Sequence, residues 1–273
     1  MNPGSTQTLD PIAKFKEAQK ESWSRFAPLA TFTTPTAAKL ARHAGIRSGQ
    51  RVLDVGCGTG PVAVTAARLG ARVTGLDLTP ELLEHARENA RIAEVDVEWH
   101  QGDAEALPFA DGSFDVVASQ FGHIFAPRPE VAVAEMLRVL KRGGTLAFAT
   151  WPPELLIGRM FALVGSYAPK PPLEIPPPGL WGDPTIVRQR LGAAVKDILF
   201  DRATMLVPVL SAQHNRMVME QTAGPVIKLV ESLSAKDPAT LEAFRKEYDA
   251  LMSQYIEDNM LRQGYLLTRA AKV

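Results

Sequence analysis

Short apolar segments alternate with helix-length segments between residues 51 and 150, and this alternation restricts the fold more than any other feature. Five segments have the composition of strands: 51–55, 72–77, 95–101, 114–119 and 145–150. The intervening segments 61–69, 79–93 and 129–140 are predicted helices. Strands separated by helices form βαβ units, in which the strands are parallel and the crossovers right-handed. The sequence therefore predicts an α/β doubly wound fold.

Proline divides the chain into parts of different character. Residues 152–184 hold many of the 21 prolines, so neither regular helix nor inner strand is expected there. Further helices are predicted at 10–24, 35–43, 184–191, 214–233 and 237–259, and further strands at 197–206 and 264–272. We therefore predict four regions: a helical lid (1–34), an α/β core (35–151), a Pro-rich and helical cap that includes a sixth strand (152–260), and a final strand (261–273) of a seven-stranded, mostly parallel sheet.

Charge and cysteine content exclude several classes of protein. Thirty basic and thirty acidic side chains give a formal net charge of +0, without the basic excess of a typical nucleic-acid-binding protein. Cys57 is the only cysteine, and the five histidines lack metal-ligand spacing, so neither a disulfide nor a metal site is expected. The sequence contains no signal-peptide pattern and no run of ~18 apolar residues, which predicts a cytoplasmic protein without a membrane span.

A glycine-rich loop follows the first predicted strand. Gly56, Gly58 and Gly60 occupy alternate positions after Val55, and a helix begins directly behind them. Ligands of open α/β sheets bind at the carboxyl ends of the strands, and glycines let the backbone approach such a ligand closely. The third glycine of the NAD fingerprint is replaced by Pro61, which disfavours a nicotinamide cofactor.

Acidic residues follow the neighbouring predicted strands. Asp77 ends the second strand, where a carboxylate can accept hydrogen bonds from both hydroxyls of a ribose. Asp103 follows the third strand, where it can accept from an exocyclic amine. Two more segments lead into later strands, Ser113-Phe114-Asp115-Val116-Val117 and Leu140-Lys141-Arg142-Gly143-Gly144-Thr145-Leu146. Together with the glycine loop, these signals predict a nucleoside-binding edge of the sheet.

The ordered signals resemble the class I S-adenosylmethionine-dependent methyltransferases over residues 35–151, in particular the small-molecule branch that includes the ubiquinone and menaquinone biosynthesis methyltransferases. Arg142 departs from the proline often found there. The resemblance implies S-adenosylmethionine as cofactor, S-adenosylhomocysteine as product and an antiparallel last strand. It also implies a set of cofactor-binding residues: Asp54 at the amino group, Gly56, Cys57 and Gly58 along the methionine portion, Asp77 at the ribose, Leu78, Asp103 and Ala104 at the adenine, and Ser119 near the sulfonium.

His123 is the candidate catalytic residue. It follows the fourth strand in Ser119-Gln120-Phe121-Gly122-His123, where it could deprotonate a substrate hydroxyl or, equally, cap a nearby helix. Apolar residues of the cap, such as Leu155, Met160 and Met205, favour a small or medium-sized apolar acceptor. Two alternatives stay open, a protein or RNA methyltransferase and a non-catalytic S-adenosylmethionine-binding protein. Neither the acceptor nor the oligomeric state follows from the sequence.

Overall fold

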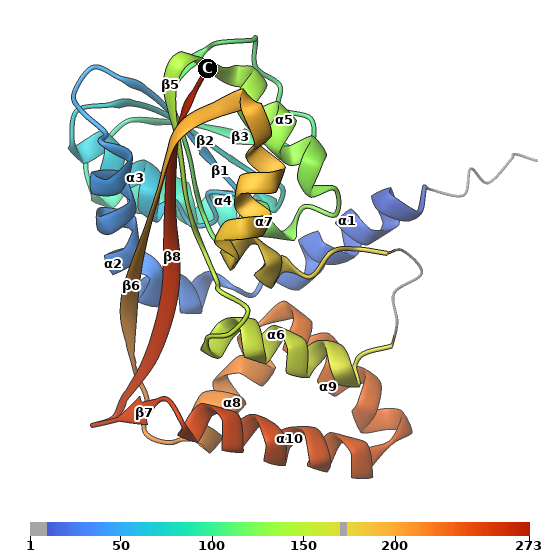
Figure 1. Cartoon of the computed structure of the whole chain (residues 1–273). Coiled ribbons are helices and arrows are strands. Elements are labelled where there is room, and N and C mark those ends of the chain that lie inside the picture. The colour runs from blue at the N-terminus through green and yellow to red at the C-terminus, as the bar shows by residue number, and fades with distance from the viewer. Residues whose placement is uncertain (1–9, 170–173) are drawn as a thin grey trace, which may run out of the picture.

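A twisted sheet forms the centre of the computed structural model, which describes residues 10–169 and 174–273. Its strands are β1 (Arg51–Val55), β2 (Arg72–Asp77), β3 (Val97–Gln101), β4 (Phe114–Gln120), β5 (Leu140–Thr150), β6 (Val195–Pro208), β7 (Ile256–Glu257) and β8 (Met260–Lys272). They are arranged in the order β3-β2-β1-β4-β5-β8-β6, and β7 pairs with β8 outside this path (Figure 1). The five strands β1 to β5 are parallel, whereas β8 is antiparallel to both of its long neighbours.

This architecture confirms the predicted doubly wound α/β fold. Across residues 10–169 and 174–273 the sheet has eight strands where the sequence predicted seven, because the two-residue β7 forms a hairpin with the start of β8. The crossover helices α3 (Pro61–Arg68), α4 (Pro80–Ile92) and α5 (Pro129–Val139) each carry a proline in the first turn, where its missing N–H group costs no hydrogen bond. The crossovers place the carboxyl ends of β1 to β5 along one edge of the sheet.

The helix before β1 is longer than the sequence predicted. It is α2 (Ala27–Ala44), which contains Pro35 in its interior rather than at its start. Its buried face packs against α3 and β5. Packing of this face outweighs the hydrogen bond that an interior proline removes. The helix also runs across the boundary at 34/35 between the lid and core regions, and the predicted domain boundaries stay predictions.

Three predicted elements require correction, two in the cap and one in the core sheet. The segment 152–184, for which no regular helix was predicted, contains α6 (Leu156–Tyr167), because its prolines lie on either side of an uninterrupted apolar stretch. The predicted helix 214–233 is two helices, α8 (Ala212–Thr222) and α9 (Gly224–Lys236), because Pro225 begins a new first turn. The strand β5 begins at Leu140 and includes the paired glycines that were expected to precede it.

The remaining helices surround the carboxyl edge of the sheet. Figure 1 shows α6, α8, α9 and α10 (Pro238–Ser253) as a cluster beyond the end at which the parallel strands finish, with α1 (Pro11–Trp23) alongside. The shorter α7 (Pro184–Leu191) packs against α5 and β6 instead. One continuous apolar core joins residues of the sheet, such as Leu53, to residues of the cap, such as Phe244. Within the described residues, no helix has the length and apolar character needed to cross a membrane.

Candidate functional site

A cavity of about 330 Å³ lies between the carboxyl edge of the sheet and the cap helices. Eight of the ten site residues predicted from the sequence line it: Asp54, Gly56, Cys57, Gly58, Asp77, Leu78, Asp103 and Ala104. Ser119 and His123 are not among the lining residues. The structure therefore brings the glycine loop and all three predicted carboxylates into one cavity.

The glycine loop after β1 touches the loop after β4. Gly56 adopts a left-handed φ of 64°, which favours glycine. A Cβ atom on Gly122 would lie 2.3 Å from the carbonyl oxygen of Gly56, and a Cβ atom on Gly56 would lie 2.9 Å from the Cα of Gly122. Both positions therefore require glycine. Sequence reasoning identified Gly56 and missed the role of Gly122, although this glycine lies only three residues after the end of a predicted strand.

Asp54 has one carboxylate oxygen that lacks a partner. Its Oδ2 accepts a hydrogen bond from the N–H of Ala63 at 3.0 Å, whereas its Oδ1 is buried without a hydrogen-bond partner among the described residues. Burial raises the pKa of Asp54 to about 7, opposed by the Ala63 N–H group and reinforced by the charge of Asp77. A buried oxygen of this kind is costly unless a ligand supplies a hydrogen-bond donor or a positive charge.

Asp77 connects the second strand to the glycine loop. Its two carboxylate oxygens accept hydrogen bonds from the N–H groups of Gly58 at 2.7 Å and Thr79 at 2.9 Å. Burial raises the pKa of Asp77, and these hydrogen bonds oppose the rise. Burial likewise raises the pKa of the neighbouring Cys57 thiol, so Cys57 stays protonated and is a poor nucleophile.

An ion pair fixes the N-terminal helix to the core beside Asp103. The ammonium group of Lys16 on α1 lies 2.5 Å from Oδ2 of Asp103 and 2.6 Å from Oε2 of Glu105. The side chain of Glu105 is fully buried and also pairs with Arg128. The helix α1 therefore lies beside the cavity, bound to the same carboxylate that the family resemblance places at the adenine.

The side chains of Ser119 and His123 point into the protein core rather than into the cavity. The Ser119 hydroxyl donates to the Val55 carbonyl at 2.6 Å and accepts from the His123 N–H at 3.1 Å. Because successive strand residues alternate between faces, the next residue, Gln120, lines the cavity instead. Its Nε2 donates to the Thr33 carbonyl at 3.1 Å, and its Oε1 is buried without a partner among the described residues.

The imidazole of His123 is buried between aromatic rings. Its ring centroid lies 4.8 Å from that of Phe148 and 4.7 Å from that of Trp181. Neither ring nitrogen has a hydrogen-bond partner within the described part of the chain. Burial lowers the pKa of His123 to about 3, and the charge of Arg190 adds to this effect. The imidazole is therefore neutral at ordinary pH, and its catalytic role stays a prediction.

The rest of the cavity wall is largely apolar. Phe121 lies after β4 with a left-handed φ of 60°, and its ring stacks on Trp151 at a centroid distance of 3.9 Å. The helix α1 contributes Trp23, whose ring lies 4.6 Å from that of Phe125. The cap contributes aliphatic and aromatic side chains from α6, β6 and α8: Ile157, Met160, Phe161, Val164, Met205, Val207, Val218 and Met219. Such a wall suits an apolar molecule next to a polar nucleoside site.

Comparison with known proteins agrees with this geometry. Residues 53–148 match the family described as "Methyltransferase domain". An uncharacterized protein of Mycobacterium tuberculosis (strain H37Rv) is 36% identical over 234 residues, which cover 85% of each chain. A demethylmenaquinone methyltransferase of Renibacterium salmoninarum is 44% identical over 105 residues, or 38% of this chain and 43% of that protein.

A solved structure shares the fold. The YcgJ protein of Bacillus subtilis superimposes with a TM-score of 0.57 at 18% identity, covering 87% of this chain and 99% of that one. The strand order, the glycine loop and these matches define a class I methyltransferase fold. Residues 53–148 belong to this methyltransferase-domain family, and the chain resembles the menaquinone-biosynthesis branch of the class I S-adenosylmethionine-dependent methyltransferases.

Proposed function

We propose that this protein transfers a methyl group from S-adenosylmethionine to a small or medium-sized, mostly apolar acceptor. The observation that carries the proposal is the composition of the cavity, which has carboxylates and the glycine loop at the strand edge and an apolar wall from the cap. A lid and a cap that both line the cavity favour a small acceptor over a protein or an RNA, which would need an open cleft. The neutral net charge agrees with this preference.

The cofactor-binding residues are part of this proposal. The unpartnered Oδ1 of Asp54 suits the amino group of the methionine portion, and Gly56, Cys57 and Gly58 would line that portion. The carboxylate of Asp77 would bind the ribose hydroxyls, with Leu78 and Ala104 beside the adenine. Asp103 keeps lone pairs for an exocyclic amine while it binds Lys16, since a carboxylate has about four acceptor sites. The Ser119 hydroxyl is already engaged, so we propose Gln120 as the β4 residue beside the sulfonium.

Positioning is the main task of the surrounding residues. When bound, S-adenosylmethionine would supply a methyl group on a sulfonium. A bond would form between the acceptor and the methyl carbon as the carbon–sulfur bond breaks, its electron pair would stay on sulfur to give the neutral thioether of S-adenosylhomocysteine, and a hydroxyl acceptor would release its proton to water. The protein needs to align the two molecules, and alignment alone accounts for ~7–11 kcal/mol of barrier lowering in favourable cases. The rings of Trp23, Phe121 and Trp151 would hold the acceptor against this site and exclude water.

Calorimetry tests cofactor binding. We expect S-adenosylmethionine and S-adenosylhomocysteine to bind and NAD not to bind. Asp77→Ala should lower the affinity for S-adenosylhomocysteine at least tenfold, about 1.4 kcal/mol, whereas the exposed Asp96→Ala should leave it unchanged. Asp77 also anchors the Gly58 N–H group, so a second comparison is needed. The parent should bind 5′-methylthioadenosine more tightly than an analogue without the ribose hydroxyls, whereas Asp77→Ala should bind the two equally. If both proteins show the same preference, Asp77 does not bind the ribose.

Turnover needs a separate assay. Release of S-adenosylhomocysteine should be followed over a panel of apolar alcohols, phenols and quinols. Product formation with any of them supports methyl transfer to a small acceptor. Tight cofactor binding without product in the presence of small molecules, peptides and RNA would favour the alternative, a non-catalytic binding protein.

A further inference from the structure

A polar side chain stands in the apolar cap end of the cavity. Asn215 on α8 lines the cavity and is 8% exposed, and its neighbours on the same wall are Met160, Val218 and Met219. A buried amide in apolar surroundings is unfavourable unless hydrogen bonds satisfy it. The partners of Asn215 therefore indicate what the cavity is built to bind.

Only one side of the Asn215 amide is satisfied by the protein. The hydroxyl of Tyr248 on α10 donates to Oδ1 of Asn215 at 3.0 Å. Tyr248 is fully buried, and burial raises the pKa of its hydroxyl, so the proton needed for this hydrogen bond is retained. Within the described residues, no hydrogen bond is formed by Nδ2 of Asn215. The amide therefore has two N–H donors left, in a residue that lines the cavity.

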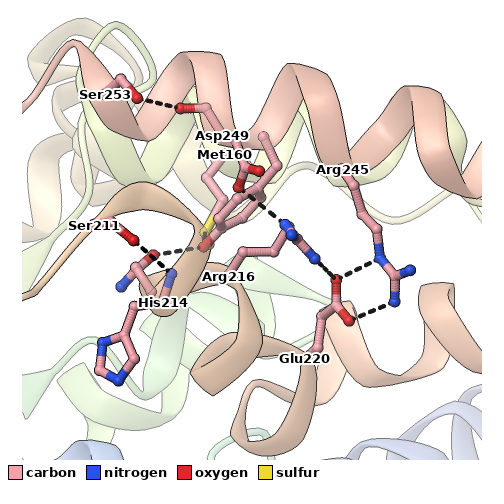
Figure 2. Close-up of polar contacts among 10 residues, drawn as sticks. Met160, Ser211, His214, Arg216, Glu220, Arg245, Asp249 and Ser253 are labelled. Carbon is pink, nitrogen blue, oxygen red and sulfur yellow. Dashed lines mark hydrogen bonds and ion pairs between the residues drawn. The ribbon is translucent and has the colours of Figure 1, made fainter.

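An ion-pair network holds α8 in the orientation that presents this amide. Arg216 binds Asp249 of α10 and Glu220 of its own helix, both at 2.9 Å, and Glu220 also binds Arg245 of α10 at 2.7 Å (Figure 2). These side chains are 12–31% exposed, so solvent screens the network less than it would screen a surface pair. Asn215 is thus oriented both by its own hydrogen bond and by its helix.

The same network limits the charge of the ligand. Glu220 lies on the same helix as Asn215, and Asp249 is next in sequence to its partner Tyr248; both carboxylates are neutralised by arginine. The amide offers donors, which repel a cationic amine and suit an oxygen with lone pairs. The surrounding wall of α6 and α8 is apolar, so the rest of the ligand is apolar as well.

We propose that Asn215 is a specificity-determining residue, and that the methyl acceptor is an uncharged, mostly apolar molecule whose carbonyl or ether oxygen accepts a hydrogen bond from Nδ2 of Asn215. Tyr248 is the positioning residue that fixes the orientation of the amide. This inference rests on the proposed function, because it assigns the cap end of the same cavity to the acceptor. His214 and Gln263 also line the cavity, and the exposed ring of His214 points away from the ion-pair network (Figure 2).

A matched pair of probes tests the assignment. We would measure binding of 2-acetylnaphthalene and 2-ethylnaphthalene by calorimetry, with the protein saturated by S-adenosylhomocysteine. The two probes have similar shapes and differ in one carbonyl oxygen. We expect the parent to bind the ketone at least tenfold more tightly than the hydrocarbon.

The variants are chosen so that the fold survives. Asn215→Leu alone would leave the buried Tyr248 hydroxyl without a partner, whereas the double variant Asn215→Leu/Tyr248→Phe replaces both hydrogen-bonding groups with apolar ones, a change that is often nearly neutral. The double variant should bind the two probes within threefold of each other. Tyr248→Phe alone should reduce the preference for the ketone without abolishing it. Gln213→Leu, an exposed amide on the same helix, is the control and should keep the parent's preference.

Two results overturn the inference. In the first, the parent binds the ketone no more tightly than the hydrocarbon, or binds neither probe. The other is a double variant that keeps the preference of the parent. Binding of S-adenosylhomocysteine, measured first with the same samples, separates the two levels: its absence from the parent refutes the proposed function, whereas its presence without a ketone preference refutes only the role of Asn215.

Discussion

Replacement of the buried His123 by leucine should stabilise the protein. Both ring nitrogens of His123 are buried without hydrogen-bond partners in the described part of the chain, and the ring packs against Phe148 and Trp181. A buried polar group without a partner costs about 1–3 kcal/mol. Leucine has a similar volume and no polar atom. We therefore expect His123→Leu to raise the free energy of unfolding at pH 8 by about 1 kcal/mol or more.

The stabilisation by His123→Leu should be larger at acidic pH. The pKa of His123 is about 3 in the folded protein and 6.5 in an unfolded chain. Below pH 6.5 the unfolded state therefore binds a proton that the folded state does not, and stability is lost as the pH falls from 6.5 to 3. At about 1.36 kcal/mol per pH unit, the loss is about 2 kcal/mol at pH 5. The variant should lack this loss, since leucine does not titrate.

Urea unfolding of the parent and of His123→Leu at pH 8 and pH 5 measures both effects. The exposed His85→Leu is the control and should keep the parent's difference between the two pH values. Other groups, including Asp54, also titrate, but they are common to all three proteins and cancel in the comparison. A His123→Leu variant with the full pH dependence of the parent would show that the imidazole is solvated, contrary to the structure.

The same variant decides the catalytic prediction for His123. A general base needs to reach the substrate directly or through one water, and the ring of His123 is not part of the cavity wall. We expect turnover of His123→Leu to stay within threefold of the parent. A large fall in turnover, with unchanged cofactor affinity and stability, would support the role that the sequence suggested.

Three further changes have defined outcomes. Gly122→Ala should destabilise the protein by more than about 2 kcal/mol and weaken cofactor binding, because its Cβ would collide with the backbone of Gly56. Thermal unfolding measures this loss. The control is Gly165→Ala, at an open position in a helix, which should be neutral or stabilising. S-adenosylmethionine binding near pH 7 should release protons, because its ammonium group lowers the raised pKa of Asp54; buffer-dependent binding enthalpies measure this release, and Asp54→Asn should abolish it. Lys16→Met should detach α1 from its two carboxylate partners. We expect proteolysis within the lid to be faster than in the parent, and the cofactor to protect the variant less than it protects the parent. Unchanged cleavage would show that packing alone holds the lid.

The amino-acid sequence determined the sheet and the polar edge of the site. Strand and helix periodicities are local, so β1, β2, β4 and the helices between them were predicted almost to the residue. The glycines and carboxylates of the site follow successive strands, and parallel strands end at one edge of the sheet. Their meeting in one cavity was therefore predictable from their positions in the chain alone.

Other features depend on contacts between distant segments, and only the tertiary structure decided them. The helix α2 continues through Pro35 because its apolar face is buried against the core, and Gly122 is required because the Gly56 backbone lies against it. Side chains alternate between the two faces of β4, and the tertiary packing decides that Ser119 points inward and Gln120 toward the cavity. The hydrogen bond between Asn215 and Tyr248 joins two cap helices. Such pairings arise from packing in three dimensions, for which a single sequence carries no periodic signal.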